Sequence, residues 1–422
     1  MEGDFKKWDN VTLDSLTDDD TPITYGVVKP GEEGDVPFIR GGDIAGGRIL
    51  IDQLRTISRE VSVQYRRTLL RGGEILVSLV GNPGQVAIAP PELAGANIAR
   101  QVGLVRLKPN IDQRFVSYFL QSPQGQAAFG AQSLGSVQQV INLRDLKTVK
   151  VPLPPLAEQK RISGILGTLD EKIELNRKMN ETLEQMAKAT FKSWFIDFDP
   201  VHAKAAGRQP AGMDKATADL FPDSLVDSEM GKIPKGWRVG KLGDIGFNPR
   251  RGVQPEDISA DTPYIGLEHM PRRCIALGEW ANSNEAGSGK SEFKKGEILF
   301  GKLRPYFHKV GVAPFDGICS TDILVLSPRS PEWFGLLLCH ASSDELIRFV
   351  DQASTGTKMP RTNWGDISSF KAAIPPESIA DKLTSSIVTK VNYIHENLRQ
   401  SRTLSLLRDS LLPKLLSGES AI

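Results

Sequence analysis

Two kinds of hydrophobic pattern alternate along the chain. In residues 21–155 and 233–376, short apolar runs are separated by Gly, Pro and polar residues, which is typical of short β-strands. Both segments end in Pro-Pro, and beyond each Pro-Pro the apolar residues recur every three or four positions, as on one face of an α-helix. The pattern therefore predicts a mixed α/β domain followed by a long helix, and then the same pair again.

The strand-like runs come in the same order in both mixed segments. In the first segment they are residues 36–40, 74–81 and 101–109, and in the second 263–267, 297–303 and 322–328. A short helical stretch follows, at 115–122 or 333–341, and one more strand closes each segment, at 149–153 or 370–374. Both segments are thus expected to share one fold.

The two helical stretches are long. The first starts at Leu156 and meets no Pro before Pro200, and the second runs from residue 377 to residue 417. A helix of about 37 residues extends about 55 Å. Because helices of this length rarely stand alone in water, we expect an intramolecular antiparallel coiled coil. The charged residues between the apolar positions make a membrane-surface helix the weaker alternative.

The sequence itself is duplicated. Residues 133–155 and 354–376 share seven identical positions out of 23, where about one or two are expected by chance. Three shorter blocks recur in the same order: Trp8, Leu13 and Leu16 as Trp237, Leu242 and Ile245; 35–44 as 261–270; and 70–76, which ends in Gly-Glu-Ile-Leu, as 293–299. Common turn residues do not explain four blocks in one order, so we infer a duplicated domain.

These patterns define a fold class and its boundaries. We predict an α/β protein with two similar mixed α/β domains, joined by two long antiparallel helices and related by an internal pseudo-twofold duplication. The expected segments are a first domain at 1–155, a first long helix at 156–198, a linker at 199–232, a second domain at 233–376 and a second long helix at 377–417.

Composition and charge add a weak pointer to a partner. The 422 residues are 40% apolar and 24% charged, as in globular proteins of two or three domains. The net charge is only +1, but residues 21–157 carry 15 Lys and Arg against 10 Asp and Glu, behind an acidic leader with two against seven. Because counterion release responds to local charge, this basic block is compatible with nucleic-acid binding.

Several other classes of protein lack support in the sequence. Three cysteines, the start MEGDFKKWDN without an apolar core, and the absence of any apolar run near 18 residues predict a cytoplasmic chain with no membrane partner. The five histidines show no metal-binding spacing, so no metal site is expected.

Two strings resemble catalytic motifs only in part. NEAGSGKS (284–291) has Asn284 at the first Gly position of a phosphate-binding loop, and a strand rather than a helix is expected after it. DFDPV (197–201) lacks the second Pro and the aromatic residue of a methyltransferase catalytic strand. We therefore expect no catalytic residue and no cofactor in this chain.

Two similar domains held by long helices suggest a ruler in which each domain reads one patch of an extended partner. B-DNA suits such a ruler, because half-sites about one turn, or 34–36 Å, apart present the same face.

Three stretches are specific enough to indicate a family. PLPPLAEQKRISGILGTLDEKIELNRKMNETLEQMAKATFKSWFIDFDPV (152–201) resembles the central conserved region of the DNA-specificity subunit of type I restriction–modification systems. IPKGWRVGKLGDI (233–245) resembles the beginning of that family's second target-recognition domain, and LLPKLLSGE (411–419) its C-terminal end. The first copy has only Trp8, Leu13 and Leu16 in place of the Pro-Lys-Gly-Trp start.

The resemblance implies a non-catalytic subunit with two target-recognition domains, each reading half of a split double-stranded DNA sequence. Two modification subunits, which bind S-adenosylmethionine and methylate adenine N6, would dock on the helices. Two restriction subunits that use ATP and Mg²⁺ could join them. A non-catalytic coiled-coil scaffold for other proteins remains the alternative, and a self-sufficient enzyme of nucleotide or methyl chemistry is a third, weaker one.

Candidate DNA contacts are chosen by side-chain chemistry. Gln pairs with adenine, Arg with guanine, and Lys with guanine or phosphate. Two Gly loops offer such side chains: Gln138 and Gln139 in 135–142, and Lys358 and Arg361 in 356–363. The loops after the two Gly-Glu-Ile-Leu strands add Asn82 in the first copy and Lys302 and Arg304 in the second. Candidates mainly for phosphate contacts are Arg40, Arg66, Arg67, Arg250, Arg251, Arg272 and Arg273. Because exposed charges are commonly only solvated, we expect about a third of these residues to touch DNA.

The helices carry two further candidate sets. Asn176 and Asn397 lie 221 residues apart, like the two Pro-Pro pairs, and we predict that they lie near the mid-length of the antiparallel helix pair and fix its register. The alternative is two surface asparagines. An aromatic cluster at the end of the first helix is a candidate partner-docking site, or else packs the helix end onto a domain; its members are Phe191, Trp194, Phe195, Ile196 and Phe198.

Overall fold

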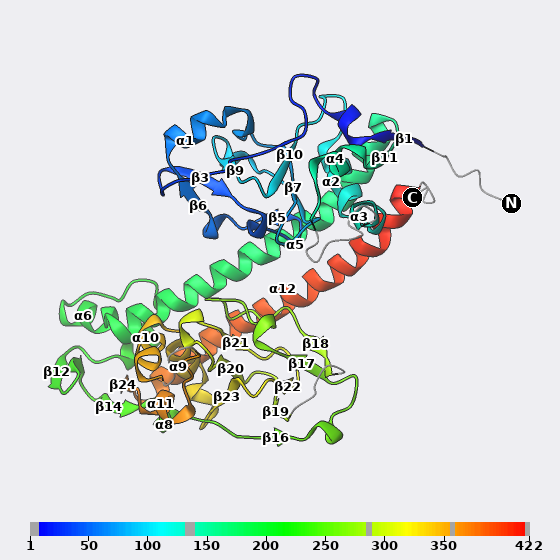
Figure 1. Cartoon of the computed structure of the whole chain (residues 1–422). Helices are drawn as coiled ribbons and strands as arrows, with labels where there is room; N and C mark the ends of the chain where they lie inside the picture. Colours follow the sequence, from blue (N-terminus) through cyan, green and yellow to red (C-terminus); the bar gives the residue numbers. More distant parts are fainter. Residues whose placement is uncertain (1–7, 131–139, 284–288, 355–358, 418–422) are drawn as a thin grey trace. The chain divides into compact units, whose positions relative to one another are not determined.

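A computed structural model of the chain describes residues 8–130, 140–283, 289–354 and 359–417 (Figure 1). The chain divides into two compact units. The first unit comprises Met1–Lys172 and Leu404–Ile422, and the second comprises Ile173–Thr403. Each long helix therefore contributes one part to each unit.

The first unit is built on a four-stranded antiparallel sheet in the order β2-β10-β7-β8, made of Thr24–Tyr25, Val102–Val105, Ile75–Ser78 and Val86–Ile88. A second sheet, β6-β3-β9, joins Arg55–Ile57, Val36–Ile39 and Asn97–Ile98, with β3 and β9 parallel. Two further antiparallel pairs are β1 with β11 (Asp9–Thr12 and Lys150–Leu153) and β4 with β5 (Ile44–Ala45 and Arg48–Ile49). The helices are α1 Arg59–Gln64, α2 Gln113–Gln121, α3 Pro123–Gly130, α4 Leu143–Thr148 and α5 Leu156–Phe191.

The second unit repeats this plan. Its four-stranded sheet runs β15-β23-β20-β21, made of Gly246–Phe247, Ile323–Pro328, Ile298–Gly301 and Val310–Val312. A five-stranded sheet, β16-β19-β22-β17-β18, joins Gly252–Val253, Lys290–Phe293, Gly317–Cys319, Pro263–Ile265 and Ala281–Asn282, with β17 and β22 parallel. The pairs are β14 with β24 (Arg238–Lys241 and Lys371–Ile374) and β12 with β13 (Leu225–Ser228 and Gly231–Pro234). The helices are α6 Asp199–Ala205, α7 Lys215–Leu220, α8 Leu242–Ile245, α9 Phe334–Ala341, α10 Asp344–Ala353, α11 Trp364–Ser369 and α12 Glu377–Ser417.

The matching strand orders confirm the predicted fold class of two similar mixed α/β domains with two long antiparallel helices. Several positions shared by the two copies have a local structural reason. Asn142 is the N-cap of α4, and its side chain accepts a hydrogen bond from the backbone N–H of Asp145. Asn363 is the N-cap of α11 and accepts in the same way from the N–H of Asp366. The atypical start of the first copy did not fix the position of its first strand. In the structure this strand, β1, begins at Asp9 directly after Trp8, just as β14 directly follows Trp237.

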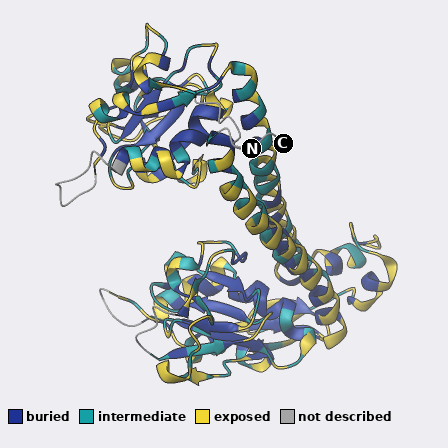
Figure 2. Cartoon of the chain, turned by 90° about the vertical axis from the view of Figure 1, so that its right-hand side faces the viewer, coloured by how far each residue is buried: buried dark blue, intermediate teal, exposed yellow. Residues whose placement is uncertain are grey.

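Buried residues concentrate on the strands of each unit (Figure 2). The core of the first unit combines strand residues with α2 and with Ile162 and Leu166 of α5. The core of the second unit packs its sheets against Phe191 of α5 and against Leu383 and Ile387 of α12. Each long helix is thus amphipathic by necessity, since one face buries apolar residues against a domain.

The two long helices contact each other in both units and run antiparallel in the second. In the second unit, Asn180 lies opposite Asn397, with 2.8 Å between the Asn397 Nδ2 donor and the Asn180 Oδ1 acceptor. In the first unit, Arg408 Nη1 donates to Asp170 Oδ1 at 2.8 Å. Within the second unit, Asn176 Nδ2 also donates to Gln400 Oε1 at 2.8 Å, so partner numbers fall along α12 as they rise along α5, as predicted for an intramolecular coiled coil.

The segment predicted as a linker, 199–232, is more structured than a bare connection. It contains α6, α7 and β12, and Val201 and Phe221 are buried in the core of the second unit. The first long helix also ends earlier than residue 198, because α5 passes into a π-helical turn at Lys192–Ile196. Phe198 then adopts a left-handed backbone conformation that redirects the chain into α6.

Candidate nucleic-acid interface

In the first unit, three loops meet at one end of the four-stranded sheet. Leu79, which follows β7, donates its N–H to the carbonyl of Gln101 at 2.7 Å and accepts from the N–H of Ile141 at 3.0 Å. The loop after β7, the turn before β10 and the end of the Gly loop are therefore held together. We call this set the three-loop surface of the unit.

The second unit has the same three-loop surface. Lys302, which follows β20, donates its N–H to the carbonyl of Asp322 at 2.9 Å and accepts from the N–H of Thr362 at 3.0 Å. The Arg304 N–H also donates to the carbonyl of Pro360 at 2.8 Å. The structure thus brings Arg361 next to two other candidates, Lys302 and Arg304, which precede it by about 60 residues in the sequence.

The three-loop surface of the second unit is cationic and aromatic. The Arg272 and Arg304 guanidinium carbons lie 4.1 and 5.9 Å from the centre of the Phe307 ring. Tyr306, beside Phe307, is 48% exposed. Arginines flanking an aromatic residue can stack on bases and bind phosphates, so this surface has the chemistry of a nucleic-acid site.

One lysine near this surface is poorly suited to phosphate binding. Lys309 Nζ donates to the Leu267 carbonyl at 2.5 Å. Burial, followed by the nearby Arg272, lowers the pKa of Lys309. Its positive charge is thus already engaged with the protein.

The three-loop surface of the first unit is less charged. A hollow of about 290 Å³ is lined there by Tyr25, Val28, Val80, Arg100 and Gln101. Asn82 is exposed in the loop after β7, next to this hollow in sequence. The candidates predicted from the sequence did not include Tyr25, Arg100 or Gln101. Gln101 is the counterpart of Asp322 in the second unit, because the carbonyls of both accept the equivalent backbone hydrogen bond.

The remaining candidates lie elsewhere or are engaged with the protein. Arg40 forms an ion pair with Asp43 at 2.7 Å, Arg251 pairs with Glu297, and Arg273 pairs with Asp344 at 2.8 Å. Three exposed arginines take no part in the hydrogen bonds that build either three-loop surface: Arg66 and Arg67 in the turn Arg66–Thr68, and Arg250 before β16. Gln138, Gln139 and Lys358 lie outside the described residues, as do residues 284–288 of the NEAGSGKS string.

Similarity to known proteins bears on this geometry. A family model described as the type I restriction modification DNA specificity domain matches residues 6–185. The specificity subunit of the type I restriction enzyme MjaIX from Methanocaldococcus jannaschii is 28% identical over 414 residues, covering 94% of this chain and 89% of that protein. The HindI specificity subunit from Haemophilus influenzae is 23% identical over 433 residues, covering 91% and 94%.

The chain is thus similar over most of its length to type I restriction–modification specificity subunits. A solved structure agrees on the fold. The type I restriction–modification S subunit from M. genitalium aligns over 98% of this chain and 97% of its own, with a TM-score of 0.54 and 17% identity.

The two predicted register residues are buried in the helix pair. Asn176 is fully buried, and its Nδ2 donates to Gln400 Oε1 at 2.8 Å and to Ser401 Oγ at 3.2 Å. Asn397 is 8% exposed and pairs with Asn180 rather than directly with the Asn176 side chain. These bonds link specific turns of α5 and α12, while their role in fixing register stays a prediction.

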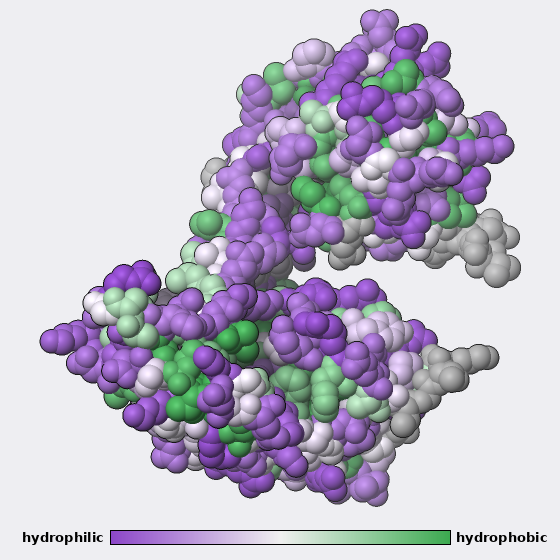
Figure 3. Space-filling view, turned by 90° about the vertical axis from the view of Figure 1, so that its left-hand side faces the viewer, coloured by the Kyte–Doolittle hydropathy of each residue, from purple (hydrophilic) through white to green (hydrophobic). Residues whose placement is uncertain are grey.

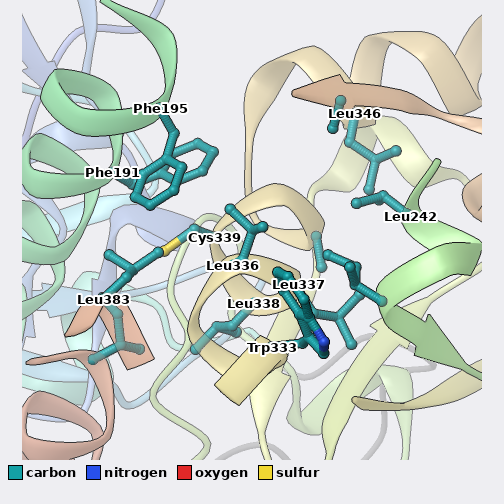
Figure 4. Packing of buried hydrophobic residues seen from close by; sticks show 14 of the residues in the cluster. Phe191, Phe195, Leu242, Trp333, Leu336, Leu337, Leu338, Cys339, Leu346 and Leu383 are labelled. Carbon is teal, nitrogen blue, oxygen red and sulfur yellow. The ribbon is translucent and has the colours of Figure 1, made fainter. Parts of the chain in front are cut away.

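The aromatic cluster at the end of α5 lies largely in the core of the second unit (Figure 4). Phe191 stacks on Phe195 at 5.8 Å between ring centres, and Phe195 lies 5.4 Å from Trp237. Trp194 and Phe198 are only partly buried against the same core. Phe191 and Phe195 thus pack the end of α5 against the core of the second unit. A partner-docking role stays a prediction for Trp194 and Phe198, which are less buried.

A cavity of about 240 Å³ lies between α5, α9, α10 and α12 of the second unit. Its apolar lining includes Leu183, Leu338 and Val391, and charged side chains such as Lys192 also border it. Figure 3 shows hydrophobic residues reaching the surface on one face of this unit. The second unit therefore offers apolar as well as charged side chains where these helices meet.

Two features are absent from the described residues. Among them, no group of three or more His, Cys, Asp and Glu side chains is arranged to hold a metal ion. No helix in the described part of the chain is long and apolar enough to cross a membrane.

Proposed function

We propose that each three-loop surface reads one half of a split DNA target. The observation that carries this proposal is that the same three loops meet in both units, while the side chains they display differ. A duplicated scaffold with different side chains on one loop set is what two independent half-site readers require. Asn82 and Arg100 in the first unit, and Lys302, Arg304 and Arg361 in the second, have the chemistry to contact base edges or phosphates.

We further propose that the helix pair sets the spacing between the half-sites and binds two modification subunits. S-adenosylmethionine would be bound, and adenine N6 methylated, by those subunits, and ATP with Mg²⁺ would be used by restriction subunits if they join. The burial of α5 and α12 residues in both units supports the spacing role, since the pair is anchored to each domain. The cavity along α5 and α12 supports the docking role.

Binding of the assembled methyltransferase complex to a library of randomised duplexes tests this function. We expect enrichment of one bipartite sequence. Arg361→Ala should weaken one base preference by about 1–3 kcal/mol and leave the other half of the target unchanged. Equal weakening on every sequence would show that Arg361 contacts only phosphate, and a complex with no sequence preference would favour the scaffold alternative.

A further inference from the structure

One acidic side chain lies inside the cationic three-loop surface of the second unit. Asp322 Oδ1 accepts a hydrogen bond from Arg361 Nε at 3.2 Å. The backbone of Asp322 is held as well, because its carbonyl accepts the Lys302 N–H and its N–H donates to Ser320 Oγ at 3.2 Å. The carboxylate is thus a fixed point against which the Arg361 side chain is oriented.

The backbone of Arg361 is fixed on both sides. Arg361 forms an antiparallel bridge with Leu303, and its neighbours Pro360 and Thr362 each hydrogen-bond to the loop after β20. The side chain is 51% exposed, whereas that of Asp322 is 27% exposed. The guanidinium group therefore extends towards solvent from a backbone position that is held in place.

This pairing leaves part of the guanidinium group available. Only Nε bonds to Asp322, and within the described residues the two terminal nitrogens of Arg361 have no carboxylate or carbonyl partner. Two terminal N–H donors in a rigid fork match the O6 and N7 acceptors of guanine in the major groove. Fixing Nε restricts the rotamers of the side chain and so reduces the entropy lost on binding.

Comparison of the two copies supports a role in specificity rather than in folding. By the 221-residue repeat, Val140 of the first unit corresponds to Arg361, and Gln101 corresponds to Asp322 by their shared backbone hydrogen bonds. The first unit builds the same three-loop surface without either member of the ion pair. The pair is therefore not needed to assemble the loops.

We propose that Asp322 is a positioning residue that aims Arg361 at a guanine in the half-site read by the second unit. This inference rests on the proposed function. The first unit, with Val140 and Gln101 in these places, has the chemistry for a thymine methyl group and an adenine instead. The two halves of the target would then differ in base composition at equivalent positions.

The test is a double-mutant cycle in the complete complex with its modification subunits. Wild type, Asp322→Asn, Arg361→Ala and the double variant are compared on duplexes with G, A, C or T at each position of the target. Asp219→Asn, an exposed carboxylate on α7, is the matched control. We expect Arg361→Ala to reduce one guanine preference by about 10-fold or more, and Asp322→Asn to reduce the same preference by several-fold.

The cycle separates positioning from folding. If Asp322 acts through Arg361, the double variant behaves like Arg361→Ala alone, and the preferences in the other half-site do not move. Additive effects, an unchanged guanine preference in Asp322→Asn, or equal losses in both half-sites would each overturn the inference. A wild-type complex without any base preference would instead refute the proposed function.

Discussion

Arg304 shows how the two copies of one loop differ at the scale of a residue. It stands two positions after Lys302, as Gly81 stands two positions after Leu79, and both residues have positive φ angles, +50° and +94°. A left-handed backbone costs a non-glycine residue about 1–2 kcal/mol. Strain of this kind is commonly kept where a side chain has a function.

Arg304→Gly should therefore separate stability from DNA binding. Glycine removes the strain but loses about 0.5–1 kcal/mol in backbone entropy, so the melting temperature should stay level or rise slightly. Affinity for the DNA target should fall, because a cation of the three-loop surface is lost. Thermal denaturation and DNA titration of the same preparation measure both effects.

Arg250→Gly is the matched control, since Arg250 has the same φ of +50° but takes no part in the three-loop hydrogen bonds. It should relieve strain without weakening the recognition of DNA bases. A large loss of stability in Arg304→Gly would contradict the strain argument, and unchanged affinity would contradict the binding role.

His340 predicts a pH dependence of the second unit. It lies on α9 against Phe191, with 4.9 Å between ring centres, and burial lowers its pKa to about 4. An unfolded histidine has a pKa of about 6.5, so between these values the unfolded state binds more protons and stability falls as pH falls. The difference corresponds to about 3 kcal/mol of stability, present above pH 6.5 and lost towards pH 4.

His340→Leu should flatten this part of the stability curve relative to wild type. Denaturant unfolding followed by tryptophan fluorescence suits the measurement, because five of the six Trp residues lie within 173–403. Equal pH slopes for both proteins would show that His340 is already protonated in the fold or is not the controlling group.

The sequence located only part of the candidate site at this scale. Lys302, Arg304 and Arg361 could be selected because side-chain chemistry and the repeat both pointed to their loops. Asp322 and Gln101 could not, since each looks like the ordinary start of a strand. Their importance depends on backbone hydrogen bonds between loops far apart in the chain, which no local pattern encodes.

At the scale of elements, the asparagines of the helix pair form a small polar network. Asn397 donates to Asn180 at 2.8 Å, and Asn176 donates to Gln400 and Ser401 on the same stretch of α12. Removing one partner of a buried hydrogen bond costs about 1–3 kcal/mol, whereas replacing all partners by apolar residues can be neutral or stabilising. A polar seam residue can in turn specify register.

Asn397→Leu alone should therefore destabilise the protein, because it leaves the buried Asn180 amide unpaired. The triple change Asn176→Leu, Asn180→Leu and Asn397→Leu should restore or exceed wild-type stability, because the remaining partners Gln400 and Ser401 are exposed or half-buried and can bond water, but it should relax the helix register. Thermal unfolding, together with methylation of targets whose spacer is one base pair longer or shorter, measures both properties. Unchanged spacer preference in a stable triple variant would contradict the register role.

Elements with a strong local pattern were predictable, and the others were not. The period of three and four residues located α5 and α12 because both helices bury one face along their whole length. The short helices α3, α4, α10 and α11 were not expected, since their polar and Gly-rich surroundings resemble loops. Caps such as Asn142 and Asn363 could have indicated two of them, because Asn followed by Asp three residues later is a helix-start signal.

At the scale of the whole molecule, a nearly neutral chain can still bind DNA if its positive charges gather on one local surface. The net charge of +1 conceals a cationic three-loop surface, because acidic residues elsewhere compensate for it. The internal repeat predicted two like domains, and the common strand orders confirmed them. The target bases were beyond the sequence, since side chains displayed by the three-loop surfaces, such as Val140 and Arg361, differ between the two copies.

If this chain gives a methyltransferase complex its bipartite DNA target, methylation of that target depends on this gene. The most direct measurement is the map of N6-methyladenine in the genome of the source cell, with and without this gene, read by single-molecule sequencing. We expect loss of methylation at one split motif on deletion of the gene, with both half-sites and their spacer visible in the lost sites. An unchanged methylation map in cells that express the gene and its modification subunit would show that the chain does not select the methylated target.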